Sequence, residues 1–248
     1  MDTTKKEDLL GVYDALLSSY GLQGWWPLKS RAGEDGFDLR GYHRGDYRHT
    51  ISPEEKFEVA VGAILAQSTS WMNVEKALKN LNDAGLLSLH GIKKTPPHKL
   101  SPLIKSSLYH NIKAKKLKAF TDFVYENFDG DVESLLALPL TELRTTLLSV
   151  WGIGPETADS VILYAAGKPS FVVDAYTKRI FGRLGVVSGN EPYEQVKEFF
   201  EKNLPRKAPL YNEFHALIVE HAKQHCKKKE DCVKCPTKEY CEFSCARQ

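Results

Sequence analysis

Cysteine is missing from the first 225 residues of this 248-residue chain, and all five cysteines fall within the last 23 positions. The polar N-terminus has no apolar stretch followed by a cleavage site, so we expect no secretory signal and a cytoplasmic protein. In that compartment close-spaced cysteines hold a metal or cluster more often than they form disulfides. No apolar run approaches membrane-spanning length, and the mean hydropathy of −0.38 is that of a soluble globular protein.

Acidic residues are missing between Ala84 and Thr121, although this stretch carries eight lysines. The whole chain is close to neutral, with a formal net charge of +2, so the stretch gives one part of the molecule a local positive charge. Such a distribution is typical of a protein that meets phosphates on one face. A solvated lysine surface is the alternative interpretation.

Strand signals are also scarce, because only Phe171–Val173 resembles a strand and it is too short to found a sheet. Helical periodicity predicts a helix over 9–20 that ends at Gly21, and Ser52 begins another through a capping box with a following proline. Further helices are expected around 71–81, 117–124, 143–148, 158–165, 176–184, 193–203 and 210–223, with a lysine-rich loop between 81 and 117 and an irregular excursion over 21–51. The fold class is therefore all-α.

A glycine hairpin, Gly152-Ile153-Gly154, joins two of these helices. Glycines at such a turn let a ligand approach the backbone, and the unpaired amides and positive dipole end of the next helix suit a phosphate. Asp174 follows, between an apolar run and a basic helix. Taken separately, the hairpin also fits an ordinary connector, and Asp174 also fits a helix N-cap.

Together, the hairpin, the Val-Val-Asp segment and the basic helix resemble the helix-hairpin-helix Gly/Pro-Asp superfamily of DNA base-excision glycosylases, the endonuclease III-like enzymes. The resemblance implies that Gly152 and Gly154 grip a phosphate of double-stranded DNA and that Asp174 drives cleavage of the bond between a flipped-out damaged base and its sugar. The carboxylate would stabilise the oxocarbenium character of the sugar or help to orient the attacking water. It also implies two helical lobes, a barrel over 52–166 and a second lobe from 1–51 plus 167–248.

Two further segments resemble the parts of that family that enter the DNA stack. Gln67 resembles the glutamine that fills the gap left by the base, and Tyr109 resembles the residue wedged against the opposite strand. Asn111, Lys113 and Lys178 are candidate contacts to DNA. The alternatives are a helix C-terminal cap for Gln67 and a surface aromatic for Tyr109.

The cysteine spacing resembles the C-terminal [4Fe–4S] loop of the same family, with Cys226, Cys232, Cys235 and Cys241 as ligands. The first gap holds five residues here, one fewer than is usual in the family. Four thiolates at such spacing also suit tetrahedral Zn²⁺, so zinc is the alternative cofactor.

Position 156 decides the expected reaction. Bifunctional members of the family carry a lysine there, whose amine forms a Schiff base with the sugar and leads to strand cleavage. Glu156 cannot form an imine, so we expect a monofunctional enzyme with weak or absent lyase activity, in which Glu156 orients water or acts electrostatically. A first-turn acid stabilised by the helix dipole is the alternative.

The tryptophans indicate which kind of damaged base the enzyme removes. Trp25, Trp26 and Pro27, with Trp71 beyond them, resemble the base pocket of the 3-methyladenine branch of the superfamily, and a cationic alkylated purine stacks well on indole rings. The alternative is that these tryptophans are core packing for the segment 21–51.

The sequence therefore predicts a monomeric, monofunctional DNA glycosylase of base excision repair that acts on an alkylated purine such as 3-methyladenine. Rivals within this class act on uracil, a thymine mismatch or adenine, or are bifunctional like endonuclease III. A non-catalytic helix-hairpin-helix DNA-binding module is the rival from another class. The presence of Asp174 speaks against this alternative, because a negatively charged carboxylate does not help a hairpin that only binds phosphate.

Overall fold

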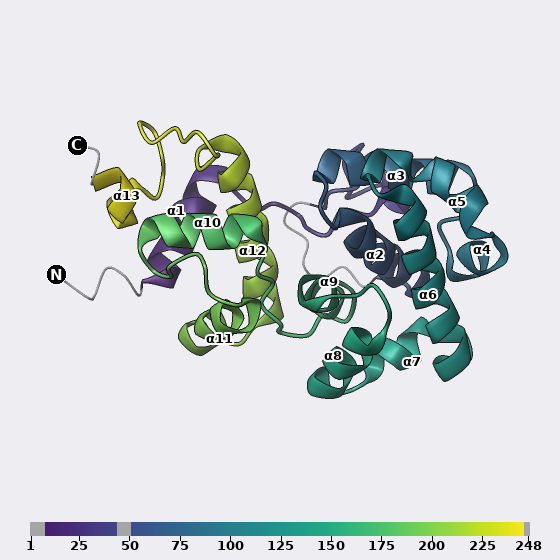
Figure 1. Cartoon of the computed structure of the whole chain (residues 1–248). Coiled ribbons are helices and arrows are strands. Elements are labelled where there is room, and N and C mark those ends of the chain that lie inside the picture. The colour runs from purple at the N-terminus through teal and green to yellow at the C-terminus, as the bar shows by residue number, and fades with distance from the viewer. Residues whose placement is uncertain (1–7, 44–50, 246–248) are drawn as a thin grey trace. The chain divides into compact units, whose positions relative to one another are not determined.

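The computed structural model describes residues 8–43 and 51–245, and within these ranges the regular structure is helical, without a strand. The all-α prediction is confirmed. The chain divides into two compact units, one formed by 26–168 and the other by 1–25 with 169–248 (Figure 1). Among the described residues, no helix combines the length and the apolar character needed to cross a bilayer.

The unit of residues 26–168 is built around α2 (Pro53–Ala66), which begins with the expected capping box between Ser52 and Glu55. Phe57 of this helix stacks on Phe120 of α6 with ring centroids 6.1 Å apart. Full burial of a side chain of this size contributes about 1.5–3 kcal/mol. The other helices of the unit are α3 (Trp71–Asp83), α4 (Leu89–Lys94), α5 (Pro97–Leu103), α6 (His110–Phe128), α7 (Val132–Ala137), α8 (Leu140–Ser149) and α9 (Pro155–Ser160).

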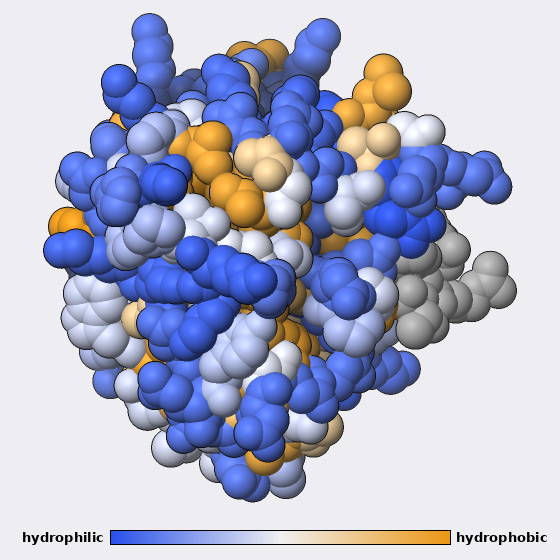
Figure 2. Space-filling model, turned by 90° about the vertical axis from the view of Figure 1, so that its right-hand side faces the viewer, coloured by the Kyte–Doolittle hydropathy of each residue, from blue (hydrophilic) through white to orange (hydrophobic). Residues whose placement is uncertain are grey.

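The lysine-rich segment between α3 and α6 is largely helical, which corrects the expected loop. Ser88 caps α4, Pro97 opens α5, and their apolar residues Ile92 and Leu100 are fully buried. Each helix spans fewer than two turns, so no periodicity can be read from its sequence. The face of this unit in Figure 2 is mostly hydrophilic. Exposed lysines of the stretch are Lys94, Lys99, Lys105 and Lys115.

Residues 26–43 belong to this first unit, whereas the sequence had assigned them to the second lobe. The backbone amides of Lys29 and Ser30 donate to the buried carboxylate of Glu58 on α2. Arg40 forms a bidentate ion pair with Glu75 on α3. These contacts explain why residues 26–43 join the first unit. The sequence did not predict this, because a segment without helical periodicity has no pattern that shows which helices it packs against.

The second unit is centred on α12 (Ala208–Gln224), which packs against α1 (Leu9–Tyr20) and α10 (Ala175–Leu184) (Figure 1). Its aromatic core includes Phe171, which stacks on Phe200 at 4.2 Å, and Phe181, which meets the same ring edge-on at 4.7 Å. Two more helices, α11 (Tyr193–Asn203) and α13 (Glu242–Cys245), complete the unit.

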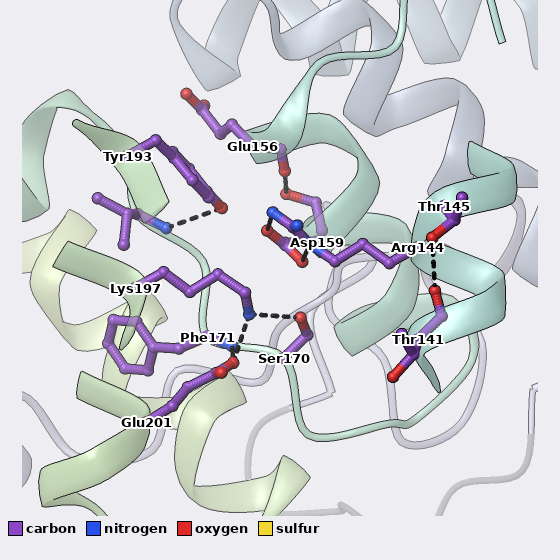
Figure 3. Close-up of polar contacts among 12 residues, drawn as sticks. Thr141, Arg144, Thr145, Glu156, Asp159, Ser170, Phe171, Tyr193, Lys197 and Glu201 are labelled. Atoms are coloured by element: carbon purple, nitrogen blue, oxygen red, sulfur yellow. Dashed lines mark hydrogen bonds and ion pairs between the residues drawn. The ribbon is translucent and has the colours of Figure 1, made fainter. Parts of the chain in front are cut away.

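Polar side chains of α11 hold the extended segment that leads into α10 (Figure 3). The buried ammonium of Lys197 donates to Ser170 Oγ (2.7 Å) and to the carboxylate of Glu201. That carboxylate accepts the amide N–H of Phe171 (2.9 Å). The backbone therefore enters α10 along a fixed path, which determines the position of Asp174 three residues later.

Candidate functional site

The glycine hairpin lies between α8 and α9, and its two glycines differ in function. Gly152 has a φ of 90°, and a Cβ at this position would lie 2.5 Å from the side chain of Lys116. Gly154 has an ordinary φ of −98°, and no atom lies within 4 Å of where its Cβ would be. Gly152 is thus required by the fold, while Gly154 leaves open space beside the amides at the start of α9.

A buried ion pair fixes α9 against α8 (Figure 3). Arg144 donates through Nε and Nη2 to the two carboxylate oxygens of Asp159, at 2.9 and 3.1 Å, and Asp159 is fully buried. Beyond Asp159 the helix widens into a π-helical turn over Val161–Ala165, a feature often found at functional sites. Arg144 and Asp159 support the hairpin, and the sequence alone does not reveal this, because each has the pattern of an ordinary charged residue of a helix.

Gln67 lies at the C-terminal end of α2 and contacts the hairpin. Its Nε2 donates to the carbonyl of Gly152 (2.9 Å) and to Thr157 Oγ1 (3.0 Å), while its Oε1 accepts a hydrogen bond from Lys116 Nζ. Gln67 is the C-cap residue of α2, as in the alternative interpretation of its role. The structure thus brings Gln67, the hairpin and Lys116 into one network.

The turn before α6 presents apolar side chains in a strained backbone. Leu108 and Tyr109 have φ values of 61° and 44°, and their exposed fractions are 49% and 67%. Consecutive left-handed residues other than glycine are unfavourable, and such strain often marks functional turns. Asn111 is exposed just beyond, and its Oδ1 accepts a hydrogen bond from the hydroxyl of Ser101.

Lys113 is buried, although the sequence predicted that it contacts DNA. Its side chain is 2% exposed, and its ammonium donates to the carbonyls of Leu65 (2.8 Å) and Ser107 (2.5 Å). Burial, with a smaller effect from the charge of Lys116, lowers the pKa of Lys113 to about 8. Lys113 therefore joins α2 to the strained turn and is not presented to DNA, which corrects its assignment as a DNA contact. Lys178 donates to the carbonyl of Glu191 (2.7 Å).

Asp174 is the N-cap of α10, and its two carboxylate oxygens have different surroundings. Oδ1 accepts hydrogen bonds from the amide (2.7 Å) and the hydroxyl (2.8 Å) of Thr177. Oδ2 lies 3.8 Å from Nε2 of His215 on α12. Both the cap and the catalytic prediction remain compatible with this geometry, because the cap uses only Oδ1.

The two adjacent tryptophans belong to different units, since the boundary falls between them. The ring of Trp25 packs edge-on against His215 at 5.8 Å, and its carbonyl accepts a hydrogen bond from Asn212. The ring of Trp26 meets Trp71 at 4.8 Å and Tyr164 at 4.9 Å. Trp25, Trp26 and Pro27 are buried, while Trp71 keeps an intermediate exposure.

Glu156 lies in the first turn of α9, where its side chain is exposed. A carboxylate at this position is stabilised by the helix dipole. Its position and its exposure are compatible with both interpretations of Glu156, a role in the reaction and a first-turn acid that only stabilises the helix.

The four cysteines of the predicted cluster loop line one cavity with Arg183, His221 and Thr237. Arg183 donates to Cys226 Sγ (3.3 Å), and the thiol of Cys241 donates to the carbonyl of Arg183 (3.5 Å). None of the four forms a disulfide. Within the described residues no group of three or more potential ligands already has the arrangement of a metal site.

Comparison with known proteins identifies the family. Residues 61–206 match the model of the HhH-GPD superfamily of base excision DNA repair proteins. The chain belongs to this superfamily. It is 44% identical over 243 residues to a protein of Methanocaldococcus jannaschii provisionally named DNA repair glycosylase MJ1434, covering 97% of this chain and 99% of that one. It is also 31% identical to endonuclease III of Thermotoga maritima, over 76% of this chain and 84% of the relative.

Solved structures of the superfamily have the same fold as this member. The crystal structure of the Helicobacter pylori 3-methyladenine DNA glycosylase MagIII bound to 1,N6-ethenoadenine matches with a TM-score of 0.66 at 26% identity, covering 88% of this chain and 97% of that one. A non-covalent endonuclease III–DNA complex matches with a TM-score of 0.72 at 19% identity, covering 98% of this chain and 97% of that one. The endonuclease III-like fold prediction is confirmed, and the chain is a DNA repair glycosylase of the HhH-GPD family.

The two hairpin glycines should respond differently to alanine. Gly152→Ala should lower the free energy of unfolding by about 1–3 kcal/mol, because alanine is strained at a φ of 90° and its Cβ meets Lys116. Gly154→Ala should leave it unchanged, because its backbone is unstrained and the space is open. Urea unfolding of both variants measures the difference, and equal stabilities would contradict the geometry described above.

Proposed function

We propose that this protein is a monofunctional DNA glycosylase that removes an N-alkylated purine such as 3-methyladenine from double-stranded DNA by water attack, and that it acts as a monomer. The observation that carries the proposal is the pair of residues at positions 156 and 174. Asp174 offers a carboxylate held at a helix N-terminus, and Glu156 stands where bifunctional members of the superfamily carry a Schiff-base lysine. A carboxylate stabilises an oxocarbenium-like sugar but cannot form an imine.

The features of the first unit support a DNA-binding role. The open space beside Gly154 admits a phosphate to the backbone amides at the start of α9. The exposed side chains of Leu108 and Tyr109 are suited to entering a base stack at the place where a nucleotide has left it. Gln67 is already beside the hairpin. We propose that it gives up its hydrogen bonds there and bonds instead to the base left unpaired when the damaged base flips out.

Lys116 is a better candidate for a phosphate contact than Lys113. The ammonium of Lys116 donates to Gln67, and the aliphatic part of its side chain lies beside Gly152. The ammonium of Lys113, in contrast, is hydrogen-bonded to two buried carbonyls. When Gln67 moves toward the DNA, the ammonium of Lys116 loses its amide partner and becomes available to a phosphate oxygen. This exchange replaces a neutral acceptor with a charged one, which gives the stronger hydrogen bond.

The preference for an alkylated purine is supported by the aromatic cluster of Trp26, Trp71 and Tyr164. A cationic purine gains from stacking on electron-rich rings and is already a good leaving group, so no strong general acid is needed. The similarity to the Helicobacter pylori enzyme bound to 1,N6-ethenoadenine is consistent with a purine substrate. Trp71 is the partly exposed ring of the cluster, and we propose that it stacks on the base.

The cysteine loop is proposed to hold a [4Fe–4S] cluster, with Cys226, Cys232, Cys235 and Cys241 as its ligands. All four thiols line one cavity and none is oxidised to a disulfide, which is the donor set that such a cluster requires. The bound cluster would anchor the loop after α12. The hydrolysis itself requires no electron transfer, so no reaction step is assigned to the cluster.

Replacing Asp174 separates catalysis from folding. Asparagine is as good an N-cap as aspartate, so Asp174→Asn keeps the acceptor for Thr177 and removes the charge. Base release should fall by at least about 10²–10³-fold, while affinity for duplex DNA changes only a few fold. Single-turnover release of base and equilibrium binding measure the two effects. Near-wild-type release by the variant would remove Asp174 from the catalytic role.

The residue at position 156 should decide whether the strand is cut. Wild-type protein should leave intact abasic strands until alkali or heat is applied, and borohydride should trap no covalent complex, because Glu156 has no amine. Glu156→Lys restores an amine and should introduce measurable trapping, with Glu156→Gln as the matched control. Efficient trapping by the wild-type protein would show that another amine attacks the sugar.

The base preference follows from the aromatic cluster. The enzyme should release 3-methyladenine from methylated DNA much faster than uracil or 8-oxoguanine from duplexes that carry one lesion. Trp71→Ala should cost about 1–3 kcal/mol of transition-state stabilisation for the alkylated base, as loss of base–aromatic stacking typically does. Uracil as the best substrate, or an unchanged rate in a folded Trp71→Ala protein, would contradict the alkylpurine assignment.

Metal analysis of the purified protein tests the cofactor. We expect a brown protein with broad visible absorbance and about four irons per chain. Cys232→Ser should lower the iron content and the absorbance together. Stoichiometric zinc without iron would overturn the cluster assignment in favour of a tetrahedral site.

A further inference from the structure

His215, in the middle of α12, lies close to Asp174 Oδ2, the carboxylate oxygen that does not take part in the helix cap. Asp174 Oδ1 is held by the amide and the hydroxyl of Thr177, so the carboxylate cannot turn without breaking the cap. His215 Nε2 lies 3.8 Å from Oδ2. This separation is too long for a direct hydrogen bond, and two polar atoms at such a distance can share one water molecule.

The orientation of the His215 ring is fixed by its neighbours. Trp25 meets the imidazole edge-on, with an angle of 84° between the ring planes. One turn earlier on α12, Asn212 donates to the carbonyl of Trp25 (3.0 Å) and so holds that residue in place. Burial lowers the pKa of His215, although the nearby Asp174 charge opposes the shift. The neutral ring that results has one nitrogen that can accept a hydrogen bond.

We propose that His215 is a second catalytic residue, whose Nε2 holds the hydrolytic water together with Asp174 Oδ2. This inference rests on the proposed glycosylase function and deepens it. With one water hydrogen directed at each acceptor, the lone pairs of the water oxygen are free to attack the sugar C1′. The oxygen–C1′ bond forms as the C1′–N bond breaks, and the electron pair of that bond leaves with the base. The proton of the water passes to Asp174 Oδ2 and from there to solvent.

Substitutions at His215 distinguish this role from packing. His215→Leu removes the acceptor, and His215→Gln keeps one through its amide oxygen. Phe214→Leu is the packing control, because it alters the aromatic core at the neighbouring residue, whose ring meets those of Phe171 and Phe181. The measurements are the single-turnover release of 3-methyladenine from methylated duplex DNA, the dissociation constant for a duplex with an abasic-site analogue, and thermal unfolding. His215→Met replaces the leucine variant if that variant does not fold.

We expect His215→Leu to lower the release rate by about 100-fold, His215→Gln to recover at least about tenfold of that loss, and Phe214→Leu to release base at nearly the wild-type rate. Affinity for the abasic duplex should stay within a few fold in all variants. Equal rates for His215→Leu and Phe214→Leu, or equally slow leucine and glutamine variants, would overturn the role of His215. A wild-type protein that releases no base from methylated or other lesion-bearing DNA would instead overturn the proposed function itself, and this inference with it.

Discussion

The N-cap of α10 is the interaction on which the proposed chemistry depends. A carboxylate that accepts two hydrogen bonds from Thr177 starts the helix and is itself immobilised. The segment before it is held by Lys197 and Glu201 of α11, so the cap receives the backbone in a fixed position. In the proposed chemistry, Asp174 therefore stabilises the helix with one carboxylate oxygen and acts on the substrate with the other. A group fixed in this way needs no reorganisation when charge develops on the substrate.

In the first unit, the residues proposed to meet DNA are hydrogen-bonded to one another. Gln67, Lys116 and the Gly152 carbonyl satisfy one another through hydrogen bonds, and each of these groups is also suited to a nucleic acid. Close by, Lys113 joins the end of α2 to the strained turn that carries Leu108. Buried hydrogen bonds thus support the backbone conformation of that turn. In the proposed function the polar network exchanges its hydrogen bonds for contacts to DNA, whereas the buried ammonium of Lys113 keeps its two carbonyl partners.

Motif and periodicity predicted much of this arrangement from the sequence. The helices over 9–20 and 193–203 were found to the residue, because long amphipathic stretches end at clear signals such as Gly21. α4 and α5 are too short for a period to appear. Lys113 and Lys116 lie three residues apart on one helix, and the residue type alone cannot tell which is buried. His215 stands on α12 between Asn212-Glu213-Phe214 and the apolar run Ala216–Val219. Nothing in that pattern points to Asp174, so only the tertiary structure associates the two residues.

The chain crosses between the two units twice, and one of these crossings is the peptide bond between Trp25 and Trp26. One indole packs beside the histidine of α12 and the other against the aromatic cluster of α3. Under the proposed function, an insertion or deletion between these two residues would shift both rings and so disturb the base pocket and the hydrolytic groups together. Under the same proposal, point changes around Trp71 are a more accessible route to a new base specificity than exchange of the whole segment.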